Sequence, residues 1–124
     1  MDVSESLHIL VAEDIDSNYL LVKAILRNMH VERAVDGVKA VEMAKNSHYD
    51  CILMDMKMPN MDGLEATRHI REFDKQVSII AVTANAFDSD RKNALEAGCN
   101  DFVTKPITRG SLLDAIEKQG CKIR

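Results

Sequence analysis

Five short apolar segments alternate with five segments of helical periodicity along this chain of 124 residues. This alternation constrains the fold more than any other feature of the sequence. The segment 77–82, VSIIAV, is rich in β-branched residues, as is typical of a central strand that is covered on both faces. Strands that alternate with helices in one domain predict a parallel sheet between two helical layers. The sequence therefore predicts an α/β fold.

The limits of the expected elements follow from periodicity and from capping and turn residues. We predict strands at residues 8–12, 31–35, 51–54, 77–82 and 101–104. We predict helices at residues 16–29, 38–46, 64–73, 89–97 and 109–119. Asp16 or Ser17 is expected to cap the first helix, and Val38 and Val41 are expected to face the core from the second.

Length and charge narrow the class of protein. A chain of 124 residues without a linker is expected to form one domain, with its core at about residues 7–119. Its 16 basic and 20 acidic residues give a net charge of −4, without the basic excess of a domain that binds nucleic acid. The apolar runs are far shorter than the ~20 residues of a membrane span. We expect an intracellular domain that makes no direct contact with nucleic acid and has no membrane segment in this chain.

The cysteines and histidines show no metal-binding pattern along the sequence. Cys51, Cys99 and Cys121 are far apart and form no Cys-x-x-Cys pair, which argues against a zinc site or a disulfide framework. The four histidines form no pair at the spacing of ligands on one helix. We therefore interpret each of these residues as an ordinary core or surface residue.

Polar residues follow four of the predicted strands at their carboxyl ends, where open α/β sheets bind ligands. The first strand is followed by Glu13 and Asp14, the third by Asp55, the fourth by Thr83 and the fifth by Lys105. Taken alone, each residue is typical of a turn, a strand end or a solvated surface. If the first and third strands are neighbours, all of them converge at one edge of the sheet.

Three carboxylates at one edge would repel each other, at a cost of about 4 kcal/mol for two unit charges 4 Å apart at an effective dielectric constant of 20. A divalent cation would relieve this repulsion, and hard oxygen ligands favour Mg²⁺ or Mn²⁺ over zinc. A phosphoryl group beside that cation would find Lys105 and Thr83 around its oxygens. Asp55 could be the nucleophile, because a carboxylate can form an acyl phosphate.

Four stretches of the sequence resemble a known family: ILVAEDIDSN, ILMDMKMPNMDG, IIAVTANA and DFVTKPI. In order and spacing they resemble the signature stretches of two-component response-regulator receiver domains, over nearly the whole chain. The resemblance implies that residues 1–124 form a single receiver domain. It also implies a flavodoxin-like, doubly wound sheet of strand order 2-1-3-4-5. Such a domain is a signalling phosphoacceptor that catalyses its own phosphorylation and slow dephosphorylation.

The resemblance implies a role for each residue of the metal site. Asp55 resembles the phosphoacceptor, and Asp14 would bind Mg²⁺ directly. Glu13 would act mainly through metal-bound water, and the backbone carbonyl of Lys57 would be a further ligand. The acidic pair is Glu-Asp where many members have Asp-Asp, which should lengthen the reach of the first carboxylate to the metal.

The resemblance also implies a switch. Thr83 would be the switch hydroxyl and Lys105 the phosphate-binding lysine, positioned by a cis Lys105–Pro106 peptide. Phe102 takes the place of the switch aromatic. Because Phe102 has no hydroxyl, any switching must come from the packing of its ring.

The implied donor is a phosphohistidine on a sensor histidine kinase or a histidine phosphotransfer domain, in the cytoplasm. Lys57 and Asn85, which lie two residues after the phosphoacceptor and the switch threonine, are expected to tune the lifetime of the phosphoryl group. A dimer linked to phosphorylation remains open. The chain could be a stand-alone relay protein or the receiver of a hybrid sensor kinase, and Asn18 favours the hybrid kinase.

Two other classes of protein share part of this sequence pattern. A phosphatase of the haloacid-dehalogenase type also uses an aspartyl nucleophile, but it usually carries a second Asp two residues later, where Lys57 stands here. A flavin-binding module shares the expected sheet order, but a crevice lined with carboxylates would repel the flavin phosphate. Both classes fit the sequence less well than a receiver domain does.

Overall fold

The structure is a computed structural model that describes residues 7–84 and 88–120, with the backbone alone at 88–90. Strands and helices alternate as predicted, and apart from the first helix every limit lies within one residue of the predicted one. In chain order the elements are β1 (His8–Ala12), α1 (Asp16–Ile25), β2 (His30–Ala34), α2 (Gly37–Asn46), β3 (Cys51–Asp55), α3 (Gly63–Phe73), β4 (Ser78–Thr83), α4 (Asp88–Ala97), β5 (Asp101–Thr104) and α5 (Arg109–Lys118).

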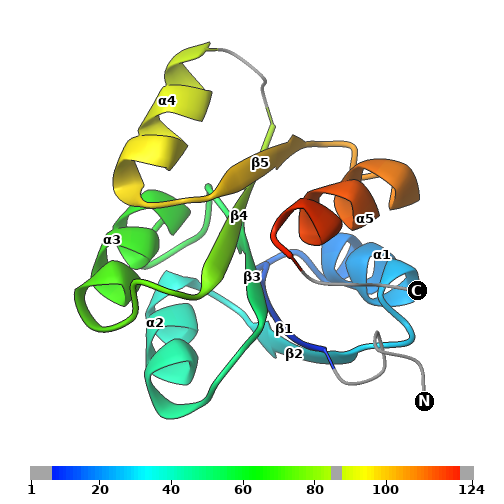
Figure 1. The fold of residues 1–124 in the computed structure, drawn as a ribbon, viewed down its shortest axis with the longest axis horizontal. Helices are drawn as coiled ribbons and strands as arrows, with labels where there is room; N and C mark the ends of the chain where they lie inside the picture. The colour runs from blue at the N-terminus through cyan, green and yellow to red at the C-terminus, as the bar shows by residue number, and fades with distance from the viewer. Residues whose placement is uncertain (1–6, 85–87, 121–124) are drawn as a thin grey trace.

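The five strands form one parallel sheet in the order β2-β1-β3-β4-β5, which confirms the doubly wound fold. Helices α1 and α5 cover one face of this sheet, and α2, α3 and α4 cover the other (Figure 1). Ala12 at the end of β1 is paired with Met54 of β3. The residues that follow β1 therefore lie beside the carboxyl end of β3. None of the described helices is long and apolar enough to cross a membrane.

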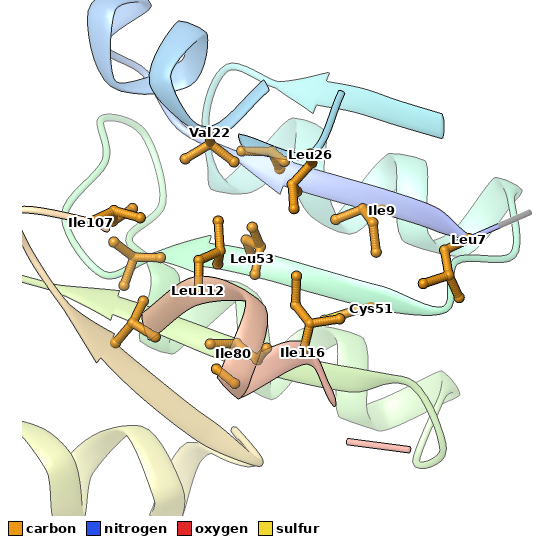
Figure 2. Close-up of a cluster of buried hydrophobic side chains, with 14 residues drawn as sticks. Leu7, Ile9, Val22, Leu26, Cys51, Leu53, Ile80, Ile107, Leu112 and Ile116 are labelled. Atoms are coloured by element: carbon orange, nitrogen blue, oxygen red, sulfur yellow. The ribbon is translucent and has the colours of Figure 1, made fainter. Parts of the chain in front are cut away.

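The sheet separates two buried apolar clusters, one under each helical layer. Ile9 and Val11 of β1 belong to the cluster under α1 and α5, whereas Leu10 and Ala12 belong to the other. Figure 2 shows the first cluster, in which side chains from α1 and α5 converge on the central strands. Burial on both faces explains why β3 and β4 read as continuous apolar runs in the sequence.

The first helix starts at residue 16 as predicted, but its predicted cap and its predicted end were wrong. The N-cap of α1 is Ile15, which makes no capping hydrogen bond with its side chain, and not Asp16 or Ser17. The carboxylate of Asp16 instead accepts a hydrogen bond from Arg33 Nη1 at 2.9 Å. The helix ends at Ile25 and not at residue 29, because the chain turns there toward β2. A long-range ion pair has replaced the local cap.

The predicted core face of α2 was partly wrong. Val41 packs against the core, but Val38 is 44% exposed and Ala40 is fully buried. The helix starts against the loop before α3, where a Cβ on Gly37 would collide with the backbone carbonyl of Met61. Because the start of the helix lies so close to this loop, the small side chain of Ala40 faces the core instead of Val38.

Candidate functional site

The carboxyl ends of four adjacent strands bring together the polar residues that were singled out in the sequence. Glu13 and Asp14 follow β1, Asp55 is the last residue of β3 and Thr83 is the last residue of β4. Lys105 follows β5, and its backbone N–H donates to the carbonyl of Thr83 at 2.8 Å. These strands are parallel neighbours (Figure 1), and all five residues therefore lie at the same end of the sheet.

Three carboxylates form the centre of the site. Glu13, Asp14 and Asp55 each offer an oxygen atom within 4.8 Å of the others. Among the side chains that the structure describes, no other three of His, Cys, Asp or Glu bring their ligand atoms this close. Glu13 and Asp55 are almost fully buried, whereas Asp14 is partly exposed. The predicted convergence of the acidic residues is therefore present in the fold.

The backbone around the carboxylates is held by contacts that the sequence did not reveal. Arg33 of β2 donates from Nε to the carbonyl of Glu13 at 3.0 Å, and its guanidinium lies 4.8 Å from the centre of the Tyr19 ring. Gly63 at the start of α3 packs against the carbonyl of Asp55, with which a Cβ would collide. These contacts hold the acidic loop and the end of β3 in position.

Lys105 supplies the positive charge of the site. Its Nζ lies 2.9 Å from Asp55 Oδ2 and 3.6 Å from Glu13 Oε1. The other oxygen of that aspartate, Oδ1, accepts a hydrogen bond from the backbone N–H of Lys57 at 3.0 Å. Burial lowers the pKa of Lys105, but the hydrogen bond and the charge of Asp55 outweigh burial and leave the pKa above its ordinary value. Lys105 thus stays charged and balances one carboxylate.

The pKa of Glu13 rises from 4.5 to about 7. Burial is the main cause, because it penalises the charged carboxylate, and the charge of Asp55 adds to it against an opposing hydrogen bond from the Ile15 N–H. A carboxyl whose pKa is raised by folding holds its proton more tightly in the folded chain. Its contribution to stability is therefore present at low pH and is lost as the pH rises through about 7.

We expect Glu13 to make the metal-free protein less stable as the pH rises from about 5 to about 8. The loss in the free energy of unfolding is at most about 3 kcal/mol. Urea unfolding in EDTA across this pH range measures it, and the Glu13→Gln variant should show a flatter pH profile than the wild type. Identical profiles for the two proteins would contradict the raised pKa.

The donor set fits a hard divalent cation. Asp14 Oδ1 is buried and has no hydrogen-bond partner in the structure, although a buried carboxylate oxygen is costly unless a donor or a cation faces it. When all three carboxylates are ionised, the single ammonium of Lys105 balances only one of their three negative charges. Oxygen ligands and this charge match Mg²⁺. The residues present therefore fit the metal that was expected from the sequence.

A cavity of about 130 Å³ opens beside Asp55. Thr83 and Lys105 line it together with Asp55, so one small anionic group could contact all three. Leu64 of α3 and Asn93 of α4 also line the cavity, and sequence reasoning missed both of them. Helical periodicity gave no signal for these two residues, because the face that a helix turns toward the strand ends depends on tertiary packing.

Phe102 is partly buried, and the guanidinium of Arg91 lies 5.0 Å from the centre of its ring. The Lys105–Pro106 peptide is cis, as the family resemblance implies. The side chain of Lys57 is exposed. Asn85 lies outside the described residues.

Comparison with known proteins agrees with this geometry. The family model for the response regulator receiver domain matches residues 9–117. Among relatives, the hybrid signal transduction histidine kinase I of Dictyostelium discoideum is 44% identical over an alignment of 125 residues. This alignment covers 92% of this chain. This chain spans only 7% of the length of that kinase.

Two solved structures extend the comparison. The receiver domain of the sensor histidine kinase PA1611 from Pseudomonas aeruginosa PAO1 is 41% identical, with a TM-score of 0.86 over 92% of this chain and 97% of its own. That structure has a magnesium ion coordinated in the active-site cleft. The receiver domain of the Saccharomyces cerevisiae response regulator Ssk1, crystallised with the histidine phosphotransfer protein Ypd1, is 32% identical, with a TM-score of 0.88 over 94% of this chain and 90% of its own.

Proposed function

Because this chain belongs to the response regulator receiver domain family of two-component systems, we propose that Asp55 is the residue that accepts the phosphoryl group. The observation that carries this assignment is the fixed position of its carboxylate. Lys105 Nζ lies 2.9 Å from Oδ2, and the Lys57 N–H donates to Oδ1 at 3.0 Å. Asp55 is also the carboxylate that borders the cavity, together with the hydroxyl-bearing residue Thr83.

The residues Glu13, Asp14 and Asp55, with the backbone carbonyl of Lys57, would hold Mg²⁺ beside this cavity. When bound, the metal supplies charge neutralisation and orientation for the phosphoryl oxygens. Asp14 is the most direct candidate ligand, because its buried Oδ1 has no other partner. Glu13, whose Oε2 already accepts from the Ile15 N–H at 3.2 Å, would act mainly through a bound water.

The transfer itself is carried by residues of this chain. An oxygen of Asp55 attacks the phosphorus of the donor phosphohistidine in line, so that an O–P bond forms as the N–P bond breaks and the histidine nitrogen keeps the electron pair. Lys105 leaves the carboxylate and pairs with the phosphoryl oxygens, and the Thr83 hydroxyl donates to one of them.

Mass spectrometry of the intact protein tests this function. After incubation with acetyl phosphate and Mg²⁺, the wild type is expected to gain the mass of one phosphoryl group, and EDTA should prevent the gain. If no gain occurs, binding of Mg²⁺ and of beryllofluoride, a phosphoryl mimic, separates a receiver that accepts only protein donors from a site that does not work. Failure of both ligands to bind would refute the proposal.

The Thr83→Ala variant should separate phosphorylation from signalling. Thr83 is almost fully buried at the end of β4 beside the cavity. Without its hydroxyl, Asp55 should still be phosphorylated, but the phosphoryl group would lose the contact through which Phe102 is expected to move. We expect the affinity of the partner for the phosphorylated variant to stay at its unphosphorylated value. A variant that responds like the wild type would rule out this coupling.

The lifetime of the phosphoryl group should depend on the residues at the mouth of the cavity. Lys57 is exposed and lines the cavity. Asn85, which lies outside the described residues, is the second candidate. Replacing Lys57 with alanine is expected to change the rate of autodephosphorylation several-fold without preventing phosphorylation, because its side chain borders the path of the attacking water. Decay of the phosphorylated mass with time measures this rate. Equal rates in the variant and the wild type would contradict the role of Lys57.

We propose that the donor is a sensor histidine kinase or a histidine phosphotransfer domain. The pairing of the Ssk1 receiver with Ypd1 supports the second kind of partner, and the similarity to hybrid kinases supports an origin in a larger sensor protein. A phosphatase of the haloacid-dehalogenase type is not favoured, because the family match is to receivers and Lys57 stands where that chemistry usually needs an aspartate.

A further inference from the structure

Two histidines and a glutamate from neighbouring strands lie together near the amino ends of these strands, at the opposite end of the sheet from Asp55. His8 and His30 are the first residues of β1 and β2, and they are direct partners in the parallel register. Residues paired in this way project their side chains from the same face of a sheet, and Glu32 projects from that face too. We propose that His8, His30 and Glu32 form a binding site for a divalent transition-metal ion such as Zn²⁺ or Ni²⁺.

The contacts of Glu32 suit a metal ligand. Its Oε2 lies 2.8 Å from His8 Nε2, so both atoms can face one cation. The hydroxyl of Tyr49 donates to Oε1 of the same carboxylate at 3.3 Å. Hydrogen bonds of this kind orient ligating carboxylates in metal sites. Because Tyr49 is only 3% exposed, the core holds the hydroxyl that orients Glu32.

The third ligand requires the rotation of one side chain. The rings of His8 and His30 lie edge to face with their centres 5.9 Å apart. In this arrangement the ligand atoms of His8, His30 and Glu32 do not lie as close together as those of the acidic site. His30 is exposed on the edge strand β2, where a change of rotamer has a small energetic cost. The bond that holds the backbone of His8 in place, from its N–H to Asp50 Oδ2 at 2.8 Å, is unaffected by this rotation.

The chemistry of the ligands separates this site from the acidic one. Imidazole nitrogens favour Zn²⁺, Cu²⁺ and Ni²⁺, whereas a site made of carboxylates and carbonyls favours Mg²⁺. The two sites lie at opposite ends of the parallel strands, about 13 Å apart along a strand of this length. Both can therefore be occupied at the same time.

A second His–Glu contact provides a matched control. His69 Nδ1 lies 3.1 Å from Glu72 Oε1, and the two residues are spaced i, i+3 on the exposed surface of α3. This pair has the same two ligand types as His8 and Glu32, but it lies within a single helix. If any exposed His–Glu pair attracted the ion, the two sites would bind it alike.

The test is a titration of the protein, without an affinity tag, with Ni²⁺ at near-neutral pH in an excess of Mg²⁺. Backbone amide signals recorded by NMR report the position of the ion, because Ni²⁺ is paramagnetic. We expect the signals beside His8 and His30 to broaden first, while those around Asp55 and around His69 stay sharp. Isothermal titration calorimetry gives the affinity.

Variants then assign the ligands. His30→Asn and His8→Gln are each expected to weaken Ni²⁺ binding by about tenfold or more, while His69→Asn leaves it unchanged. His30→Asn is the decisive variant for the metal site, because an exposed residue on an edge strand can be replaced without loss of the fold. Unfolding curves of the variant check that the fold is kept. Ni²⁺ binding by His30→Asn at wild-type affinity, or broadening that begins at the acidic site, would overturn the proposal.

Discussion

Replacing Asp55 with asparagine is expected to abolish phosphorylation by acetyl phosphate, with a loss in rate of about 10³-fold or more. The amide has nearly the same size and can still accept the hydrogen bond that Lys57 donates to Oδ1. It is a far weaker nucleophile, and it cannot form the ion pair that joins Asp55 to Lys105 at 2.9 Å. Intact mass spectrometry of variant and wild type in Mg²⁺ measures the effect.

The Asp62→Asn variant is the matched control. Asp62 lies in the loop after Asp55 and caps α3 by accepting a hydrogen bond from the backbone N–H of Glu65 at 2.9 Å. Asparagine caps helices about as well as aspartate, so this variant should gain the phosphoryl group like the wild type. If the Asp55→Asn protein gained it at the same rate, a different residue would have to be the acceptor.

The sequence could predict the site because the carboxyl ends of parallel strands meet at one end of the sheet, however the helices pack on it. Asp55 and Thr83 were placed by the ends of two apolar runs, which are the clearest elements of the sequence. The pairing of β1 with β3 then brings Glu13 and Asp14 to the same edge. An error of one residue in a strand limit does not change this outcome, since the loop residues remain at the edge.

The parts that could not be predicted depend on contacts between distant segments. Asp16 is a good capping residue by type, but Arg33 binds its carboxylate across the sheet edge, and the local rule fails. Asn93 reaches the cavity only because of the way α4 packs. His8 and His30 share no spacing that marks a pair, and only the register of β1 with β2 brings them together.

The site also carries a cost in stability, because it gathers three carboxylates whose charge the protein balances only in part. Arg33 and Lys105 compensate part of this charge through the Glu13 carbonyl and the Asp55 carboxylate. Asp14 is the member that the protein leaves uncompensated, since its buried Oδ1 has no hydrogen-bond partner in the structure. Residues that serve function at the expense of stability are common at such sites.

The Asp14→Asn variant should therefore be more stable than the wild type without Mg²⁺ and less stable than the wild type with Mg²⁺. In EDTA, neutralising this carboxylate removes its repulsion from Glu13 and Asp55, and we expect the free energy of unfolding to rise by about 1 kcal/mol. For a chain of this size, that corresponds to a melting temperature higher by about 4 °C. In Mg²⁺ at about a hundred times its Kd, the wild type should gain about 2.7 kcal/mol that the variant does not.

Urea unfolding of both proteins, with EDTA and with Mg²⁺, measures this crossover. The control is Asp114→Asn on the exposed surface of α5, which makes the same chemical change outside the three-carboxylate cluster. It should leave the response to Mg²⁺ unchanged and alter the stability in EDTA by less than about 0.5 kcal/mol. An Asp14→Asn protein that is less stable than the wild type in EDTA, yet still stabilised by Mg²⁺, would show that Asp14 supports the fold and not the metal.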